Sequence, residues 1–290
     1  MSKARLGDVG AQAKPSRPEG NTRQRGFSRQ DVEAIEDNSR LRAPMIYEIV
    51  RREGETEMER PITSLWWSGV AAGLSISFSL LAQAILRSHL PDAPWRVLVT
   101  GFGYSVGFLM VVLARQQLFT ENTITAVLPV TRAMNFRNLG RLGRMWGVVF
   151  AANISGTLFA ALFCSFTPAL TQELRGVMIE ISRHMMESGP IEMFFKAISA
   201  GFLIAAMVWL IPSAEGSQFF VVTLMTYLIA IGDFKHIVAG SLEAFMLVVN
   251  GDLGWWQMIT LFVGPVLAGN IIGGTALFAL ISYAQVAKEV

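Results

Sequence analysis

His236 is the residue of this sequence best suited to proton exchange, because histidine is the side chain that ordinarily changes charge near neutral pH. It follows Lys235 and lies between two apolar stretches, residues 216–232 and 237–249. Within a membrane such a histidine can exchange a proton with a bound anion. A lone histidine on a helix is, equally often, a passive hydrogen-bonding residue.

Five ionisable residues lie inside or beside the apolar stretches: Arg115, Glu121, Asp233, Lys235 and Glu243. A charge near the bilayer centre costs at least about 2.5 kcal/mol, so something must compensate each of them. We expect Arg115 to pair with Glu121 or Glu243. We expect Lys235 to pair with Asp233 or Glu243. Direct contact with a substrate is the alternative for each residue.

Several chemical activities lack their usual residues. The chain has three histidines and a single cysteine, and it contains no HExxH zinc motif, no GxSxG nucleophile elbow and no nucleotide-binding loop. We therefore expect no enzyme, no metal and no cofactor. The basic residues near the amino terminus are interleaved with acids, so we expect no nucleic-acid partner.

The composition divides the chain near residue 61. Overall 52% of the residues are hydrophobic and 16% are charged, yet residues 1–60 hold 12 of the 24 Lys and Arg and 11 of the 22 Asp and Glu. Residues 1–43 are too polar to bury a core and are predicted to be a disordered cytoplasmic tail. Residues 44–60 are predicted to be an amphipathic cytoplasmic helix, and residues 61–287 a transmembrane domain.

Six apolar stretches approach the roughly 20 residues that a membrane-spanning helix needs. They are residues 62–86, 97–114, 145–172, 197–214, 216–232 and 253–287. An even number of spans places both termini on one side. Basic residues crowd the connection between the second and third spans, which assigns that side to the cytoplasm. These residues are Arg132, Arg137, Arg141 and Arg144.

The second and fifth spans do not end cleanly, since each is followed by a short polar segment and then by another apolar run. Such broken helices persist only where they are buried in protein or line a cavity. Asn153-Ile154-Ser155-Gly156 in the third span parallels Asn270-Ile271-Ile272-Gly273 in the sixth. Thr120 precedes Asn153 by about as many residues as His236 precedes Asn270. The fold class predicted is therefore an all-α membrane protein of six transmembrane helices in two inverted three-helix repeats.

We first interpret the asparagines and glycines of the spans as residues that hold helices together. Asn153 and Asn270 are expected to hydrogen-bond between helices. Glycine pairs four residues apart are expected to allow close helix contact. These pairs are Gly69 and Gly73, Gly103 and Gly107, and Gly143 and Gly147.

The six spans, Leu118-Phe119-Thr120 at the first break, His236 at the second, and the segment from Gly269 to Gly274 together resemble the formate/nitrite transporter family. The resemblance covers about residues 61–286. It implies an aquaporin-like protomer that assembles as a homopentamer with one pore in each subunit. It also implies that Thr120 and His236 meet in the pore, and that Leu118 and Phe119 form the cytoplasmic constriction.

The chain departs from the family pattern at several places. Ser188-Gly189-Pro190 stands where the family usually has an outer lysine, and Ala205 replaces an asparagine. Lys235 stands where an acid usually precedes the histidine, and Glu243 occupies an ordinarily apolar position. These differences mark a divergent branch whose substrate does not follow from the resemblance.

Three functions compete for this sequence. The first is conduction of a small monovalent anion or its protonated acid across the inner membrane, with or without linkage to protons. The second is a neutral-solute pore, and the third is a non-conducting membrane scaffold closed by buried ion pairs. Arg115 and Lys235, near a histidine, favour an anion, with the proton and the lipid bilayer as the other expected partners.

Overall fold

The computed structural model describes residues 41–289, and this part of the chain consists of helices and connecting turns without any strand. The predicted tail of residues 1–43 therefore lies almost entirely outside the described residues. Helix α2 (Ala43–Glu59) comes first, with Pro44 in its first turn, where the absent N–H of proline costs no hydrogen bond.

Within residues 41–289, five helical segments are long and apolar enough to cross a bilayer. They are Ile62–His89, Arg96–Leu113, Phe136–Phe166, Pro190–Ser213 and Trp255–Val286. The first consists of α3 (Ile62–Ile76) and α4 (Phe78–His89), the second is α5 and the third is α8. The fourth consists of α10 (Pro190–Leu210) and the short turn η1 (Ile211–Ser213).

The last long segment alternates between α-helical and π-helical turns. In order it comprises α13 (Trp255–Gln257), η2 (Met258–Val263), α14 (Gly264–Ile271), η3 (Ile272–Ala279) and α15 (Leu280–Val286). Thr275 in η3 donates from Oγ1 to the carbonyl of Thr123, at 2.7 Å. The π-helical turn therefore lies against the short helix α6 (Asn122–Thr125).

Two apolar helices are shorter, α11 (Gln218–Ile231) and α12 (Ile237–Val249). At 1.5 Å per residue α11 extends about 21 Å, less than the roughly 30 Å of a hydrocarbon core. Helices α5 and α11 each end in a non-helical segment before a new helix starts. After α5 the new helices are α6 and α7 (Val127–Arg132), and after α11 the new helix is α12.

Two helix boundaries differ from the sequence prediction. Helix α8 begins at Phe136, nine residues before the predicted span, because the Asn135 side chain caps it by accepting the Asn138 N–H at 2.9 Å. It ends at Phe166, two residues before Pro168, whose ring disfavours helix in the preceding residue. A further helix, α9 (Gln172–Met185), follows and was absent from the prediction.

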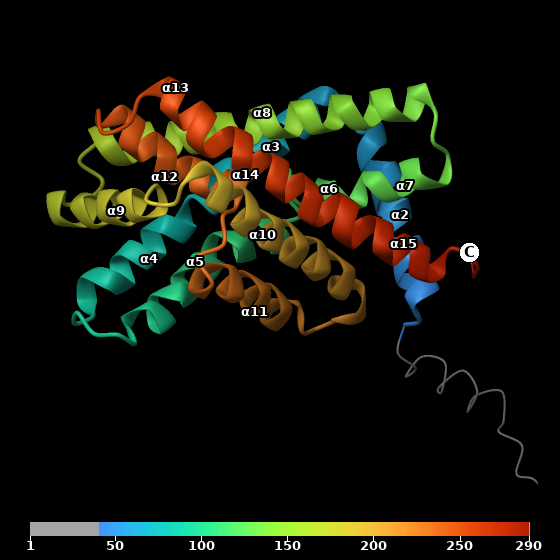
Figure 1. The fold of residues 1–290 in the computed structure, drawn as a ribbon, viewed down its shortest axis with the longest axis horizontal. Coiled ribbons are helices and arrows are strands. Elements are labelled where there is room, and N and C mark those ends of the chain that lie inside the picture. Colours follow the sequence, from blue (N-terminus) through green and yellow to red (C-terminus); the bar gives the residue numbers. More distant parts are fainter. Residues whose placement is uncertain (1–40, 290) are drawn as a thin grey trace, which may run out of the picture. The chain divides into compact units, whose positions relative to one another are not determined.

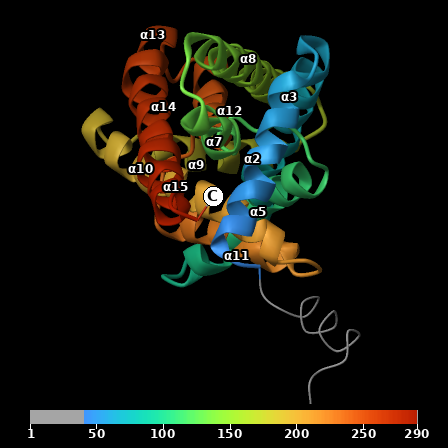
Figure 2. The same ribbon diagram turned by 90° about the vertical axis from the view of Figure 1, so that its right-hand side faces the viewer.

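The long helices pack in two similar pairs, α3 on α8 and α10 on α14 and η3. Glycines carry both contacts: a Cβ on Gly73 would collide with the Asn153 carbonyl, and a Cβ on Gly201 with the Asn270 carbonyl. Figures 1 and 2 show α3 beside α8, and α10 beside α14. Helices α2 and α9 lie at opposite ends of the bundle (Figure 1).

The predicted glycine pairs divide into two kinds. Gly69, Gly73, Gly103 and Gly107 are each in close contact with another helix. Gly143 and Gly147 contact no other helix of the described chain, since an added Cβ would meet no atom within 4 Å. Both lie in the early part of α8, which presents that face away from the rest of the described chain.

Candidate functional site

The structure brings Thr120 and His236 together in the interior, with Thr120 Oγ1 and His236 Nε2 separated by 2.7 Å. Both residues are buried, with exposed fractions of 0% and 2%. His236 also caps helix α12, because its Nδ1 accepts the N–H of Ala239 at 3.2 Å. With Nδ1 accepting, the ring proton lies on Nε2 and is donated to Thr120. The Phe108 ring packs edge-on against the imidazole, with centroids 5.0 Å apart.

Two asparagines hold the backbones that carry these side chains. Asn153 Oδ1 accepts the Phe119 N–H at 2.9 Å, and its Nδ2 lies 2.8 Å from the carbonyls of both Gly69 and Gln117. The Asn153 amide thus satisfies the Phe119 N–H and the Gln117 carbonyl, two groups of the first break that no helix satisfies.

Asn270 makes the equivalent contacts in the other half of the chain. Its Oδ1 accepts the Ile237 N–H at 2.8 Å, and its Nδ2 donates to the carbonyls of Ala197 (2.7 Å) and Lys235 (2.9 Å). Asn153 and Asn270 therefore each join two helices by a hydrogen bond and also hold the backbone of one break.

The two breaks have the same backbone conformation. Arg115 and Asp233 both have φ of 52°, the left-handed region that non-glycine residues rarely adopt. The residue after each donates its N–H to the carbonyl five residues earlier, Gln116 to Val111 and Phe234 to Ile229, both at 3.0 Å.

These contacts correct the register inferred from the sequence. The asparagines bind Phe119 and Ile237, so Leu118, and not Thr120, is the structural counterpart of His236. Thr120 reaches the histidine from two residues further along the first break.

The charges of the first break pair differently from the prediction. The Arg115 guanidinium binds Glu53 of α2, not Glu121 or Glu243, and its side chain is 79% exposed. Gln117 donates from Nε2 to Glu57 of α2 at 2.7 Å. Sequence reasoning missed both acids because it treated α2 as a separate surface helix.

The charges of the second break form a triad. Asp233 Oδ1 binds the Lys235 amine and Asp233 Oδ2 binds the Lys196 amine, both at 2.6 Å. Lys235 is 3% exposed, and this carboxylate is its ion-pair partner. Sequence reasoning missed Lys196 because the predicted fourth span began one residue after it. Its isolation was a usable signal, since no other lysine or arginine lies between Arg183 and Lys235.

Glu121 and Glu243 have no ion pair among the described residues. Glu121 has a buried Oε1 without a hydrogen-bond partner in this part of the chain. Glu243 is 8% exposed and lies on α12 two turns after His236. No cluster of histidine, cysteine, aspartate and glutamate that would suit a metal ion occurs among the described residues.

Two cavities approach the Thr120–His236 contact from opposite ends of α5. The α9-side cavity, of about 290 Å³, is lined by Tyr104, Asp233, Lys235, His236 and Glu243, with residues from the start of α5 and from α9. The α2-side cavity, of about 430 Å³, is lined by residues from the end of α5, from α2 and from the α10–α11 connection. Its charged residues are Glu53, Glu57, Arg115, Glu121 and Glu215.

The interval between the cavities is filled by buried side chains. Leu118 and Phe119, predicted to form a constriction, are 0% and 2% exposed and line neither cavity. The Phe119 ring packs edge-on against Trp146 and Phe150 of α8, at centroid distances of 5.7 and 5.2 Å. Of the two central residues, His236 lines the α9-side cavity and Thr120 lines neither cavity.

Comparison with known proteins matches residues 44–284 to the formate/nitrite transporter family model. The chain is 47% identical over 258 residues to "Inner membrane protein YfdC" of Escherichia coli, covering 89% of this chain and 83% of that protein. It is 26% identical over 242 residues to "Formate channel FocA" of Haemophilus influenzae, covering 74% and 84%.

Solved structures share the fold at lower sequence identity. A structure described as "Pentameric formate channel with formate bound" aligns with a TM-score of 0.67 at 21% identity, over 79% of this chain and 98% of that one. An "FNT family ion channel" aligns with a TM-score of 0.70 at 17% identity, over 84% and 98%.

Proposed function

Because the chain belongs to the formate/nitrite transporter family, we propose that it conducts a small monovalent anion, or the protonated acid of that anion, through a pore within each chain. Family membership makes the protein a membrane transporter and not an enzyme. The observation that carries the proposal is the buried Thr120–His236 contact between two cavities at opposite ends of α5. The relatives described as formate channels support an anion as the substrate.

The proposed topology is six spans in two inverted, aquaporin-like halves, with the second and fifth spans broken. The matching asparagine contacts and the matching φ values of Arg115 and Asp233 support this repeat. The arginines around the start of α8 support a cytoplasmic position for that end of the bundle and for both termini. The pentameric formate channel with the same fold supports a homopentamer.

The proposed mechanism assigns separate tasks to the two central residues. Because the imidazole Nε2–H donates to Thr120 Oγ1, the hydroxyl hydrogen of Thr120 is left to donate to an oxygen of the substrate. An anion entering this apolar interval loses its hydration and needs a hydrogen-bond donor, a positive centre or a proton. A second proton on His236 would occupy Nδ1 and break the bond to Ala239, so proton transfer is coupled to the first turn of α12.

One observation favours the non-conducting scaffold as a second candidate. Leu118, Phe119, Thr120 and His236 are together almost inaccessible, which is the arrangement of a closed pore. Flux measurements separate the two candidates, because a scaffold passes none of the candidate solutes.

The test is uptake of formate, nitrite and hydrosulfide into proteoliposomes, with and without a pH gradient. We expect at least one anion to enter faster than into protein-free liposomes. Thr120→Val removes the hydroxyl and keeps the shape, so it should slow this flux. Thr157→Val is the matched control, since Thr157 is equally buried but its hydroxyl binds Ser241 at 3.0 Å and not His236. Flux of none of the three anions would reject the proposal.

A further inference from the structure

The first turns of α8 carry three arginines on one face, spaced four and three residues apart. Arg137, Arg141 and Arg144 line a surface hollow of about 530 Å³ together with Gly140, Met58 and Glu59. Residues at this spacing lie above one another on a helix. Gly140 keeps the hollow open, because a Cβ there would meet nothing within 4 Å.

The positive charge of this hollow is incompletely balanced. Arg141 binds Glu59 at 3.3 Å, and the Glu59 side chain is exposed. Arg144 donates from Nη2 to the carbonyl of Met58 at 2.6 Å, which brings no counter-charge. The Arg137 side chain has no ion pair or hydrogen bond to another described residue. Three guanidinium groups therefore face one carboxylate.

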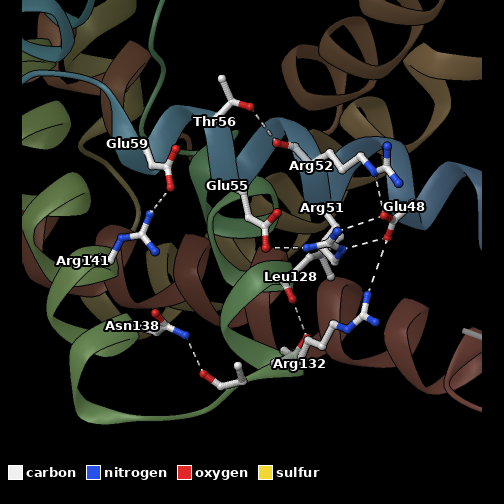
Figure 3. A network of polar contacts seen from close by, with 12 residues as sticks. Glu48, Arg51, Arg52, Glu55, Thr56, Glu59, Leu128, Arg132, Asn138 and Arg141 are labelled. Carbon is white, nitrogen blue, oxygen red and sulfur yellow. Dashed lines mark hydrogen bonds and ion pairs between the residues drawn. The ribbon is translucent and has the colours of Figure 1, made fainter.

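The neighbouring hollow is lined by Arg51, Arg132 and the shared Arg141, and its arginines are paired differently. Glu48 and Glu55 flank Arg51 at 2.8 and 2.5 Å, and Arg52 binds Glu48 at 2.7 Å (Figure 3). The two guanidinium groups of Arg51 and Arg52 lower the pKa of Glu48 to about 2, so this carboxylate stays charged and paired. Arg132 also lies 4.0 Å from Glu48. Both arginines of this hollow other than Arg141 therefore have a carboxylate partner, which Arg137 and Arg144 of the α8 hollow lack among the described residues.

Apolar side chains surround the same turn of α8. Phe136, Met134 and Leu139 have exposed fractions of 95%, 74% and 44%. Helix α8 has 31 residues and extends about 46 Å, so it exceeds the roughly 30 Å core and its first turns reach the headgroup layer. A ligand that fits here has an anionic head and apolar chains attached to it.

We propose that the α8 hollow binds the phosphate head of an anionic phospholipid, of the phosphatidylglycerol class. Arg137, Arg141 and Arg144 bind the phosphate oxygens, and the exposed apolar side chains contact the acyl chains. The apolar contacts distinguish a lipid from free phosphate, which the arginines alone would not.

Native mass spectrometry of the full-length protein tests the proposal with a pair of matched variants. Gly140→Glu places a carboxylate in the hollow, whereas Gly143→Glu places the same group on the same helix outside it. Both positions have open space for a side chain, so neither change should prevent folding. We expect Gly140→Glu to retain about five-fold less phosphatidylglycerol than the parent, with Gly143→Glu near the parent level. Equal retention by the two variants would overturn the proposal.

Two further arms identify other occupants. Phosphatidylethanolamine with the same acyl chains should be retained equally by all three proteins, and inorganic phosphate should not displace phosphatidylglycerol. Displacement by inorganic phosphate would make this a site for free anions and would overturn the assignment to lipid. Loss of the oligomer in Arg137→Gln, without loss of lipid, would assign the arginines to a subunit contact and would also overturn it.

Discussion

The two breaks share one backbone and differ in what their side chains bind. Arg115 and Asp233 occupy equivalent left-handed positions, and the asparagine contacts are equivalent. The first break, however, is bound to α2, outside the apolar bundle, through Glu53 and Glu57. The second is bound within the bundle, through the triad of Lys196, Asp233 and Lys235.

The same contrast extends to the cavities. The charged residues of the α2-side cavity are four glutamates and Arg115, whereas those of the α9-side cavity are Arg87, Arg96 and Lys235 against Asp92, Asp233 and Glu243. The two breaks thus share a backbone conformation, whereas the side chains give each cavity a different set of charges.

The largest effect should come from removing the feature that the breaks share. Asn153→Leu or Asn270→Leu leaves one N–H and one carbonyl of the break without a partner, at about 1 to 3 kcal/mol for each unsatisfied buried group. Both variants should therefore lose most of the folded, detergent-stable protein, as measured by size-exclusion chromatography with thermal unfolding. If only one of the two variants loses folded protein, the two breaks are not equivalent.

An intermediate effect is expected at the second break. Asp233→Asn leaves the buried Lys235 amine without its carboxylate and should lower stability by about 1 to 3 kcal/mol, discounted because Asp233 is itself 44% exposed. Adding Lys235→Met to Asp233→Asn should recover part of the loss in a double-mutant cycle. Additive losses would mean that the two residues do not depend on one another.

A small effect is expected at the first break. The Arg115–Glu53 pair is exposed, so Arg115→Met should cost less than about 1 kcal/mol of stability. This replaces the sequence-based expectation of a costly buried pair. A melting-temperature loss as large as that of Asp233→Asn would show that α2 holds the first break far more strongly than an exposed ion pair does.

The sequence was informative wherever a residue type is required by the backbone or the bilayer. Long apolar stretches located the five longest helical segments of the described residues, and the two asparagines of the repeated motif make matching contacts. The resemblance to the formate/nitrite transporter family is confirmed by the family match. Thr120 and His236, named from that resemblance, lie in contact.

The sequence was uninformative where contacts join distant segments through flexible side chains. Arg115 could reach several acids, and only the placement of α2 selects Glu53. Lys196 lies at a span boundary, where a shift of one residue moves it out of the predicted helix. The register of the repeat depends on which N–H each asparagine binds, and counting residues does not determine that.

The most direct test of the central claim is anion uptake by His236→Asn in proteoliposomes between about pH 5 and 8, where histidine ordinarily changes charge. Asparagine can still cap α12 by accepting the Ala239 N–H, so assembly should be intact, but it cannot exchange a proton. The account predicts that the variant loses the pH dependence of anion flux. Parental flux with the parental pH profile would contradict it and would leave His236 with a structural role as the cap of α12.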